Sequence, residues 1–190
     1  MSADLFARAL QSAATTLQSL EPLQPQLVAA ADLVLNSLAS GHKILACGNG
    51  GSAADAADFT TEFACRFVQD RRPYPALNLS QGGSLVTATG NDYGFEEIFA
   101  RQVRAFGNTG DVLVAITTSG KSENIRRAIV EGNARELTTI TLLGRDGGTC
   151  AGLANVELLV KADSTARIQE AHKFLLHTLC EMVEADLPRD

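Results

Sequence analysis

Apolar residues recur at two different spacings along the chain, and the change between them divides it into two parts. Over residues 3–19 and 25–40 they stand three or four positions apart, as on one face of a helix. Pro22 and Pro25 separate these stretches, and Gly41 follows the second. The pattern predicts two helices that pack together ahead of the main fold.

Short, continuously apolar runs replace the helical spacing after residue 41, as in the buried strands of a parallel sheet. Five such runs occur, over 43–48, 75–80, 111–117, 138–144 and 156–160. Helical patterns lie between and after them, over 53–67, 84–90, 96–106, 122–136 and 165–186. This alternation predicts a five-stranded parallel sheet with helices on both faces, a flavodoxin-like α/β three-layer sandwich. We expect one domain over residues 1–190, with the N-terminal helical pair in 1–40 and the α/β core with its C-terminal helix in 41–190.

Composition narrows the classes of function. The 190 residues carry a formal net charge of −6, and no Lys/Arg run suggests a nucleic-acid partner. No apolar stretch approaches the roughly 20 residues of a membrane span, and the N-terminus does not resemble a signal peptide. The cysteines stand singly, which favours free thiols in a cytoplasmic protein over disulfides or a zinc finger. They are Cys47, Cys65, Cys150 and Cys180.

The stretch AITTSGKSEN, residues 115–124, fits the permissive form of the P-loop pattern of nucleoside triphosphatases. A P-loop needs a flexible glycine-rich arch, whereas the arch here is ITTS, which is largely β-branched and stiff. Ala115 also falls inside an apolar run rather than after it. These features argue against a nucleotide site.

The same stretch offers several hydroxyl groups where a strand ends and a helix begins. Hydroxyls together with a helix N-terminus can bind one phosphate monoester without magnesium. A serine-rich helix cap without a ligand is the alternative. The hydroxyl residues are Thr117, Thr118, Ser119 and Ser122.

A second loop of this kind is CGNGGSAADAADF, residues 47–59. Its glycines allow positive φ and close approach of the backbone, and Ser52 stands where the next helix begins. GNGGS is not the GxGxxG pattern of dinucleotide sites, and a tight turn without a ligand would look similar. Two such loops at one edge of a sheet are more informative than either alone.

With these motifs in view, the chain resembles the sugar isomerase (SIS) domain, and more closely the bacterial phosphoheptose isomerases. That family interconverts sedoheptulose 7-phosphate and D-glycero-D-manno-heptose 7-phosphate, through an enediol, for lipopolysaccharide precursors. The resemblance spans essentially the whole chain and implies a homotetramer with active sites at subunit interfaces. It rests on CGNGGSAADA (47–56), TEF-CRF (61–67), ATGNDYGFEEIFARQV (88–103), GDVLVAITTSGKS (110–122), LLGRDGG (142–148) and TARIQEAH----H (165–177).

Carried over residue by residue, the resemblance implies three groups of site residues. Glu62 would be the catalytic base and His177 the catalytic acid. Contacts with the substrate or its phosphate are implied for Asn49, Gly50, Gly51, Ser52, Arg66, Asn91, Asp92, Thr117, Thr118, Ser119, Ser122 and Gln169. One zinc ion per subunit would be held by Asp58, Glu62, Gln169 and His177.

Two departures from the family pattern leave questions open. Zinc-binding members commonly carry His four residues before the base, where this chain has Asp58. A carboxylate can still bind zinc, so the substitution leaves open whether a metal is kept, exchanged or lost. The glycines of QGGSLV, residues 81–86, loosen a segment expected near the sugar and leave the preferred sugar open.

Other interpretations compete with the isomerase. A sister group of the family has lost catalysis and is a partner of the replication initiator DnaA, but it lacks the glutamate and the second histidine. A sugar-phosphate sensor would need a DNA-binding region, for which the chain has no room. Taken alone, Asp58, Glu62 and Arg66 would be an exposed ion-pair ladder on one helix, and His177 a surface residue. We interpret His172 as structural.

Overall fold

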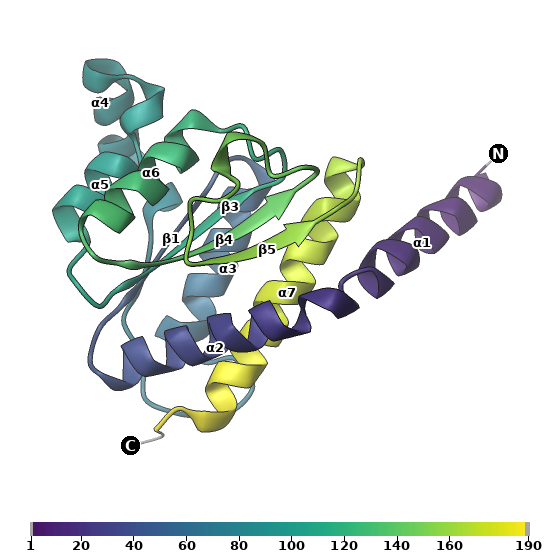
Figure 1. Ribbon diagram of the computed structural model, residues 1–190, viewed down its shortest axis with the longest axis horizontal. Coiled ribbons are helices and arrows are strands. Elements are labelled where there is room, and N and C mark those ends of the chain that lie inside the picture. The colour runs from purple at the N-terminus through teal and green to yellow at the C-terminus, as the bar shows by residue number, and fades with distance from the viewer. Residues whose placement is uncertain (1, 189–190) are drawn as a thin grey trace.

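Five parallel strands form the centre of the computed structural model, which describes residues 2–188 (Figure 1). Their order across the sheet is β2-β1-β3-β4-β5, as in a doubly wound α/β fold. All five lie where the apolar runs predict them. They are β1 (Ile44–Gly48), β2 (Ala76–Asn78), β3 (Val112–Thr117), β4 (Thr138–Gly144) and β5 (Val156–Val160).

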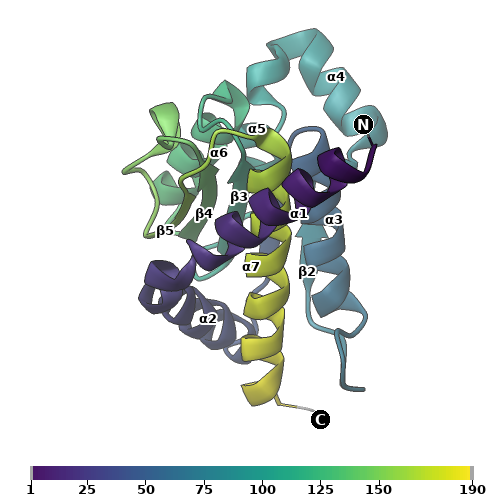
Figure 2. The same cartoon turned by 90° about the vertical axis from the view of Figure 1, so that its right-hand side faces the viewer.

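Helices cover both faces of this sheet, as the alternating pattern predicts (Figures 1 and 2). Side chains of β3 alternate between two cores: Val112 and Val114 pack with α2, α3 and α7, and Leu113 and Ala115 pack with α5 and α6. The predicted helix over 96–106 begins as a 3-10 turn and becomes α-helical only at Ala100. The helices are α1 (Ser2–Gln18), α2 (Gln24–Ala39), α3 (Gly51–Ala64), α4 (Gly83–Tyr93), α5 (Ala100–Phe106), α6 (Glu123–Ala134) and α7 (Thr165–Asp186).

The two N-terminal helices form where predicted, but the prediction that they pack together is wrong. α1 extends outward from the body, and only α2 lies along the sheet (Figure 1). Between them, the 3-10 turn Glu21–Leu23 keeps the chain in helical conformation, with Leu20 at φ −81° and ψ −15°. Proline is tolerated in the first turn of a helix, so Pro22 and Pro25 start new helical turns without reversing the chain.

α3 ends at Ala64, three residues before the predicted end at 67. The guanidinium of Arg71 donates hydrogen bonds to the carbonyls of Glu62 (2.6 Å) and Phe63 (3.0 Å), which replace helical partners at this end. Arg66 therefore lies beyond the helix, where its Nη1 bonds a nearby backbone carbonyl. Asp58, Glu62 and Arg66 therefore do not form the ion-pair ladder on one helix that they would indicate if taken alone.

Within residues 2–188, no helix has the length and apolar character needed to cross a membrane.

Candidate functional site

The carboxyl ends of β1 and β3 lie side by side, with Gly48 paired to Ile116. The chain leaves β1 into α3 and leaves β3 into α6, and the strands that follow, β2 and β4, lie on opposite sides of this pair. The strand order reverses here, and this is where open α/β sheets bind ligands. Both loops identified from the sequence meet at this point.

A cavity of about 80 Å³ opens between the two loops. The structure therefore brings together most of the residues predicted to bind phosphate, although they stand some 70 positions apart in the sequence. The lining residues are Asn49, Ser52, Ile116, Thr117, Thr118, Ser119 and Ser122.

The hydroxyl groups of the second loop converge on one another. Thr117 Oγ1 lies 3.2 Å from Ser122 Oγ and 3.4 Å from Ser119 Oγ. Ser122 occupies the N-cap position of α6, yet among the described residues its side chain accepts no capping N–H bond. Backbone N–H groups of Gly120 and Lys121 instead donate to Thr117 Oγ1 and Ser119 Oγ, at 3.2 Å each. A plain helix cap would leave Ser122 bonded to its own helix, so the geometry favours an anion cradle.

The same loop does not have the form of a P-loop. Ala115, its first residue in that pattern, is buried inside β3. Gly120 has φ +64°, and a Cβ there would come within 2.1 Å of the carbonyl oxygen of Gly147. The loop is thus pressed against the β4–β5 connection and cannot arch over a chain of phosphates.

Glycines shape the first loop in two different ways. A Cβ at Gly48 would lie 2.3 Å from the carbonyl oxygen of Ser52, so only glycine lets α3 begin this close to the strand. Gly50 has φ +55°. A Cβ at Gly51 would lie 2.4 Å from the side-chain amide of Gln169, so glycine here admits Gln169 from α7 to the start of α3.

Two residues that hold the loops around the cavity, Asn124 and Ser80, were not predicted from the sequence. Asn49 and Asn124 exchange amide hydrogen bonds of 2.9 and 3.0 Å, which join the two loops directly. Asn124 is only 3% exposed. A polar residue in an otherwise apolar helix face was the feature of the sequence that could have identified it. Ser80 Oγ bonds both the N–H and the carbonyl of Gly48, each at 2.9 Å. Asn124 thus holds the side-chain amide of Asn49, and Ser80 holds the backbone of Gly48, in place around the cavity.

α3 and α7 lie along one another and bring the remaining polar candidates together. Lys173 of α7 bonds two carboxylates of α3: its Nζ lies 2.9 Å from Asp55 Oδ1 and 2.5 Å from Asp58 Oδ2. Burial raises the pKa of Asp55, and Lys173 opposes that shift. We call this set the α3–α7 seam; its residues are Asp55, Asp58, Glu62, Gln169, Lys173 and His177.

The predicted base and acid both belong to this seam. Glu62 is half-buried in the last turn of α3, and burial together with the charge of Glu62 raises the pKa of the Cys180 thiol. His177 is exposed on α7, one turn before Cys180, with its ring centroid 5.7 Å from that of Phe67. Neither residue lines the phosphate cavity, so in one chain the two parts of the predicted site are separate.

The residues proposed for zinc do not fit a metal ion as they stand. Among residues 2–188, no group of three or more His, Cys, Asp or Glu side chains is arranged to hold one. The carboxylate of Asp58, the substituted position, is already paired with an ammonium. Zinc binding stays a prediction from the resemblance, and the arrangement of these side chains does not favour it.

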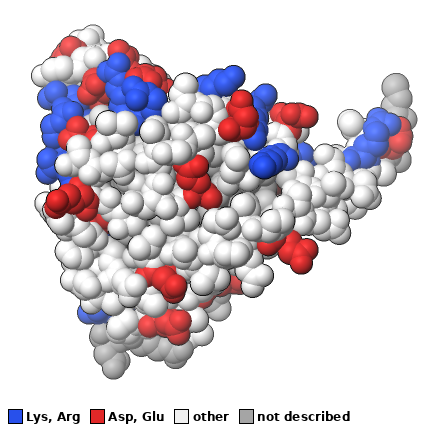
Figure 3. All heavy atoms as spheres, in the orientation of Figure 1, with Lys and Arg blue, Asp and Glu red and all other residues white. Residues whose placement is uncertain are grey.

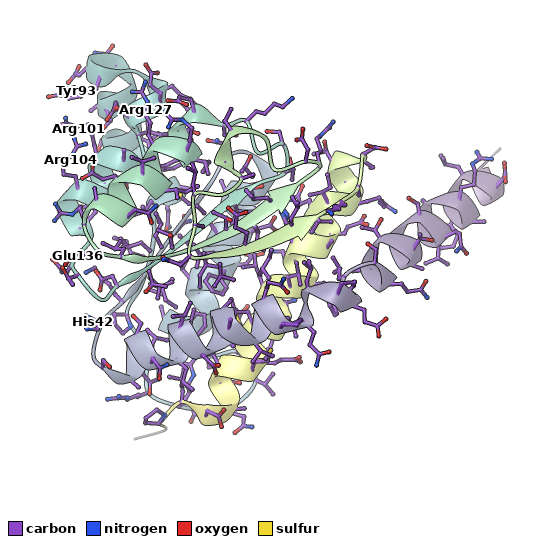
Figure 4. All side chains as sticks on the ribbon, in the orientation of Figure 1. His42, Tyr93, Arg101, Arg104, Arg127 and Glu136 are labelled. Carbon is purple, nitrogen blue, oxygen red and sulfur yellow. The ribbon has the colours of Figure 1, made fainter. Side chains whose placement is uncertain are left out.

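Asn91 and Asp92 lie outside the cavity. Both are exposed on α4, and Asn91 Nδ2 donates to Asp92 Oδ1 at 2.8 Å. The guanidinium of Arg101, on α5, lies 3.6 Å from the ring centroid of Tyr93 and holds the end of α4 in place (Figure 4). One chain therefore does not bring these two residues to the cavity between the two loops.

His172 is a core residue, in line with its structural interpretation. It is fully buried, and its Nε2 lies 3.1 Å from the carbonyl oxygen of Leu143 at the end of β4. Burial lowers the pKa of His172 to about 4, although the bond to Leu143 acts in the opposite direction. The imidazole is therefore neutral at physiological pH.

Comparison with known proteins places this site in a family. A family model described as the SIS domain matches residues 9–144. A phosphoheptose isomerase from Coxiella burnetii is 44% identical over 180 residues, which cover 93% of this chain and 90% of that protein.

Solved structures agree with the sequence comparison. Phosphoheptose isomerase GmhA from Neisseria gonorrhoeae matches with a TM-score of 0.92 and 41% identity, covering 97% of this chain and all of the other. A phosphoheptose isomerase from Francisella tularensis matches with a TM-score of 0.94 and 38% identity, covering 98% of this chain and all of the other. Since these matches span nearly the whole chain, the protein belongs to the phosphoheptose isomerase family of SIS-domain proteins.

Proposed function

We propose that the protein is an aldose–ketose isomerase that converts sedoheptulose 7-phosphate into D-glycero-D-manno-heptose 7-phosphate. The observation that carries the proposal is the cradle of hydroxyl and amide groups at the point where the strand order reverses. Its volume of about 80 Å³ is far below the roughly 300 Å³ at which pockets begin to hold drug-sized ligands. It suits a single phosphate group better than a nucleotide.

The chemistry of the cradle suits a phosphate monoester. Its serine and threonine hydroxyls can rotate to donate, and α3 and α6 both begin at it, so their N-terminal N–H groups and dipoles favour an anion. In the described part of the chain, no Asp or Glu lines the cavity to repel one. A phosphate held there orients the sugar for chemistry at its other end.

The isomerisation moves one proton between carbons and shifts the carbonyl group. The carboxylate of Glu62 removes a proton from C1 of the ketose while His177 donates a proton to the C2 oxygen, which gives an enediol. A proton then returns to C2 and the C1 hydroxyl loses its proton, which leaves an aldehyde at C1. The product would supply heptose for lipopolysaccharide precursors.

The separation of the two parts of the site supports an active site shared between subunits. Glu62 follows Ser52 by ten residues in one unbroken helix, which corresponds to about 15 Å of rise. Asn91 and Asp92, meanwhile, lie away from the cavity of their own chain on an exposed helix. We therefore propose a homotetramer in which neighbouring copies complete each site.

The surface offers apolar area for such an assembly. On the outward-pointing α1, Leu5, Phe6 and Leu10 are at least 60% exposed. In Figure 3 the charged side chains of this helix gather near its outer end, and the rest of the side shown is uncharged. At its base an apolar groove of about 480 Å³ is lined mainly by Leu17, Leu20, Leu23, Leu27, Val28, Phe174, Leu175 and Met182. Exposed apolar patches of this kind commonly mark interfaces.

We also place the reaction in the cytoplasm. All four cysteines are free thiols, a state that suits a reducing compartment.

The direct test is turnover of sedoheptulose 7-phosphate by the purified protein, with the aldose product followed by NMR. Appearance of the aldoheptose 7-phosphate supports the proposal. Turnover of only a shorter or longer sugar phosphate would mean that the proposed substrate is wrong. Failure with every sugar phosphate would mean that the protein binds its ligand without converting it. Sedimentation of the same sample gives the oligomeric state.

A further inference from the structure

The α3–α7 seam contains a cation of its own. We infer that the ammonium of Lys173 takes the place of a divalent metal ion between Asp55 and Asp58, so that this chain keeps metal out of the seam. The idea takes its location from the proposed isomerase site, but it concerns ion binding and is tested without turnover.

The contacts of Lys173 are those of a bridging cation. Its Nζ lies between one carboxylate oxygen of Asp55, at 2.9 Å, and one of Asp58, at 2.5 Å. Asp55 and Asp58 stand three positions apart on α3, so both project toward α7 on one side of the helix. One ammonium thus occupies an oxygen of Asp58, which the resemblance names as a metal ligand, and an oxygen of the neighbouring Asp55.

The buried member of the pair explains why a cation is required. The side chain of Asp55 is 1% exposed, and its Oδ2 has no hydrogen-bond partner among the described residues. A buried carboxylate is costly unless a positive charge compensates it. Among residues 2–188, Lys173 is the basic residue that forms an ion pair with Asp55.

Charge, and not access, is what would exclude a metal ion. The side chains of Lys173 and Asp58 are 29% and 60% exposed. Lys173, Asp55 and Gln169 line an open pocket of about 440 Å³. A hydrated ion can therefore reach the exposed carboxylate of Asp58, but a divalent ion within a few ångströms of the ammonium would be strongly repelled. Lysine has three donors and no acceptor, so it cannot join the ligands.

The experiment is a zinc titration of four purified proteins, read by calorimetry and by thermal unfolding. They are the natural chain, Lys173→Met, and each of these with Asp58→Asn added. The quantity compared is the difference in zinc binding between each protein and its Asp58→Asn variant, which we call Asp58-dependent binding. This difference excludes any zinc held by the exposed thiol of Cys65. Lys161→Met, at an exposed lysine elsewhere, controls for the loss of one positive charge.

The natural chain is expected to show no Asp58-dependent zinc binding, and Lys173→Met to gain it. Its apparent affinity should lie at least about tenfold above the weakest binding that the titration of the natural chain can detect, with a matching rise in unfolding temperature that Asp58→Asn abolishes. If Lys173→Met does not fold, Lys173→Gln keeps a hydrogen bond to Asp55 without the charge. Asp58-dependent zinc binding by the natural chain would overturn the inference, and so would its absence from both lysine variants.

Discussion

The proposed phosphate cradle is the cavity between the β1–α3 and β3–α6 loops. It and the α3–α7 seam are built in different ways. In the cradle, short side chains and backbone N–H groups are fixed by two tight strand–helix turns, and Asn49 and Asn124 lock the turns together. In the seam, long side chains from two helices meet across a packing interface, and their charges decide which partners they take. The cradle is therefore complete in one chain, whereas the seam can be changed by one substitution.

The two regions leave a member of the family different freedom to diverge. Backbone geometry at the cradle tolerates little change, because a Cβ at Gly48 or Gly120 would collide with backbone atoms. The seam instead carries Asp58, at a position where the resemblance to zinc-binding members predicts His, together with a lysine that pairs with it. In the proposed isomerase, binding of the phosphate end and handling of the reacting end can thus change independently.

The largest effect is expected from Glu62→Gln in the seam. Loss of the base should lower kcat by about a thousandfold, within the usual range for general-base catalysis. The phosphate cradle is untouched, so binding of the sugar phosphate should change little. Steady-state kinetics and a separate binding titration check both parts. Glu181→Gln, at an exposed site on α7, is the matched control, and near-natural turnover by Glu62→Gln would exclude Glu62 as the base.

Beyond the seam, the C-terminal end of α7 should matter for stability instead. Glu184 accepts N–H bonds from Phe67, Val68 and Gln69, and its carboxylate lies 3.3 Å from Nε of Arg71, whose side chain is 2% exposed. Glu184→Ala would leave that buried cation without its partner.

We expect Glu184→Ala to lower the free energy of unfolding by about 3 kcal/mol. Urea denaturation measures it, with Glu181→Ala as the control. Burial opposes ionisation of Glu184, yet the three N–H bonds and Arg71 lower its pKa overall. The stabilisation should therefore be present above the ordinary glutamate pKa and be lost as pH falls below it. A change under about 0.5 kcal/mol would mean that solvent replaces these bonds.

His172, on the buried side of α7, should make the stability of the protein depend on pH. Burial lowers the pKa of His172 to about 4, so between its ordinary value near 6.5 and 4 only the unfolded chain takes up this proton. Stability should fall by about 2 kcal/mol from pH 7 to pH 5 through this residue. Denaturation of His172→Gln should show a shallower pH slope than that of the natural chain. Equal slopes in the two proteins would contradict the buried, neutral imidazole.

Sequence reasoning reached the cradle because its signals are local. Each loop follows an apolar run and opens a helix, so Ser52 and Ser122 could be placed before the structure was known. The outward course of α1 could not be predicted, because its periodicity shows that it has an apolar face and not what covers that face.

The ion pairs in the seam could not be predicted from the sequence for another reason. Asp58 and Lys173 are 115 positions apart, and only the packing of α3 on α7 joins them. The early end of α3, which removes Arg66 from the predicted stripe, depends in the same way on the distant Arg71 and Glu184. Charged side chains give no periodic signal of their partners.

The smallest effect is expected from the cradle, where many groups share one phosphate. Ser119→Ala combined with Ser122→Ala removes two hydroxyls and leaves Thr117, Thr118 and the helix N-termini in place. Because these groups hold ground state and transition state alike, KM should rise about tenfold while kcat stays within about threefold. Steady-state kinetics with Ser40→Ala, an exposed serine after α2, as the control checks the split. An unchanged KM would place the phosphate elsewhere, and a fall in kcat alone would couple the cradle to the seam more tightly than the separation of the two parts suggests.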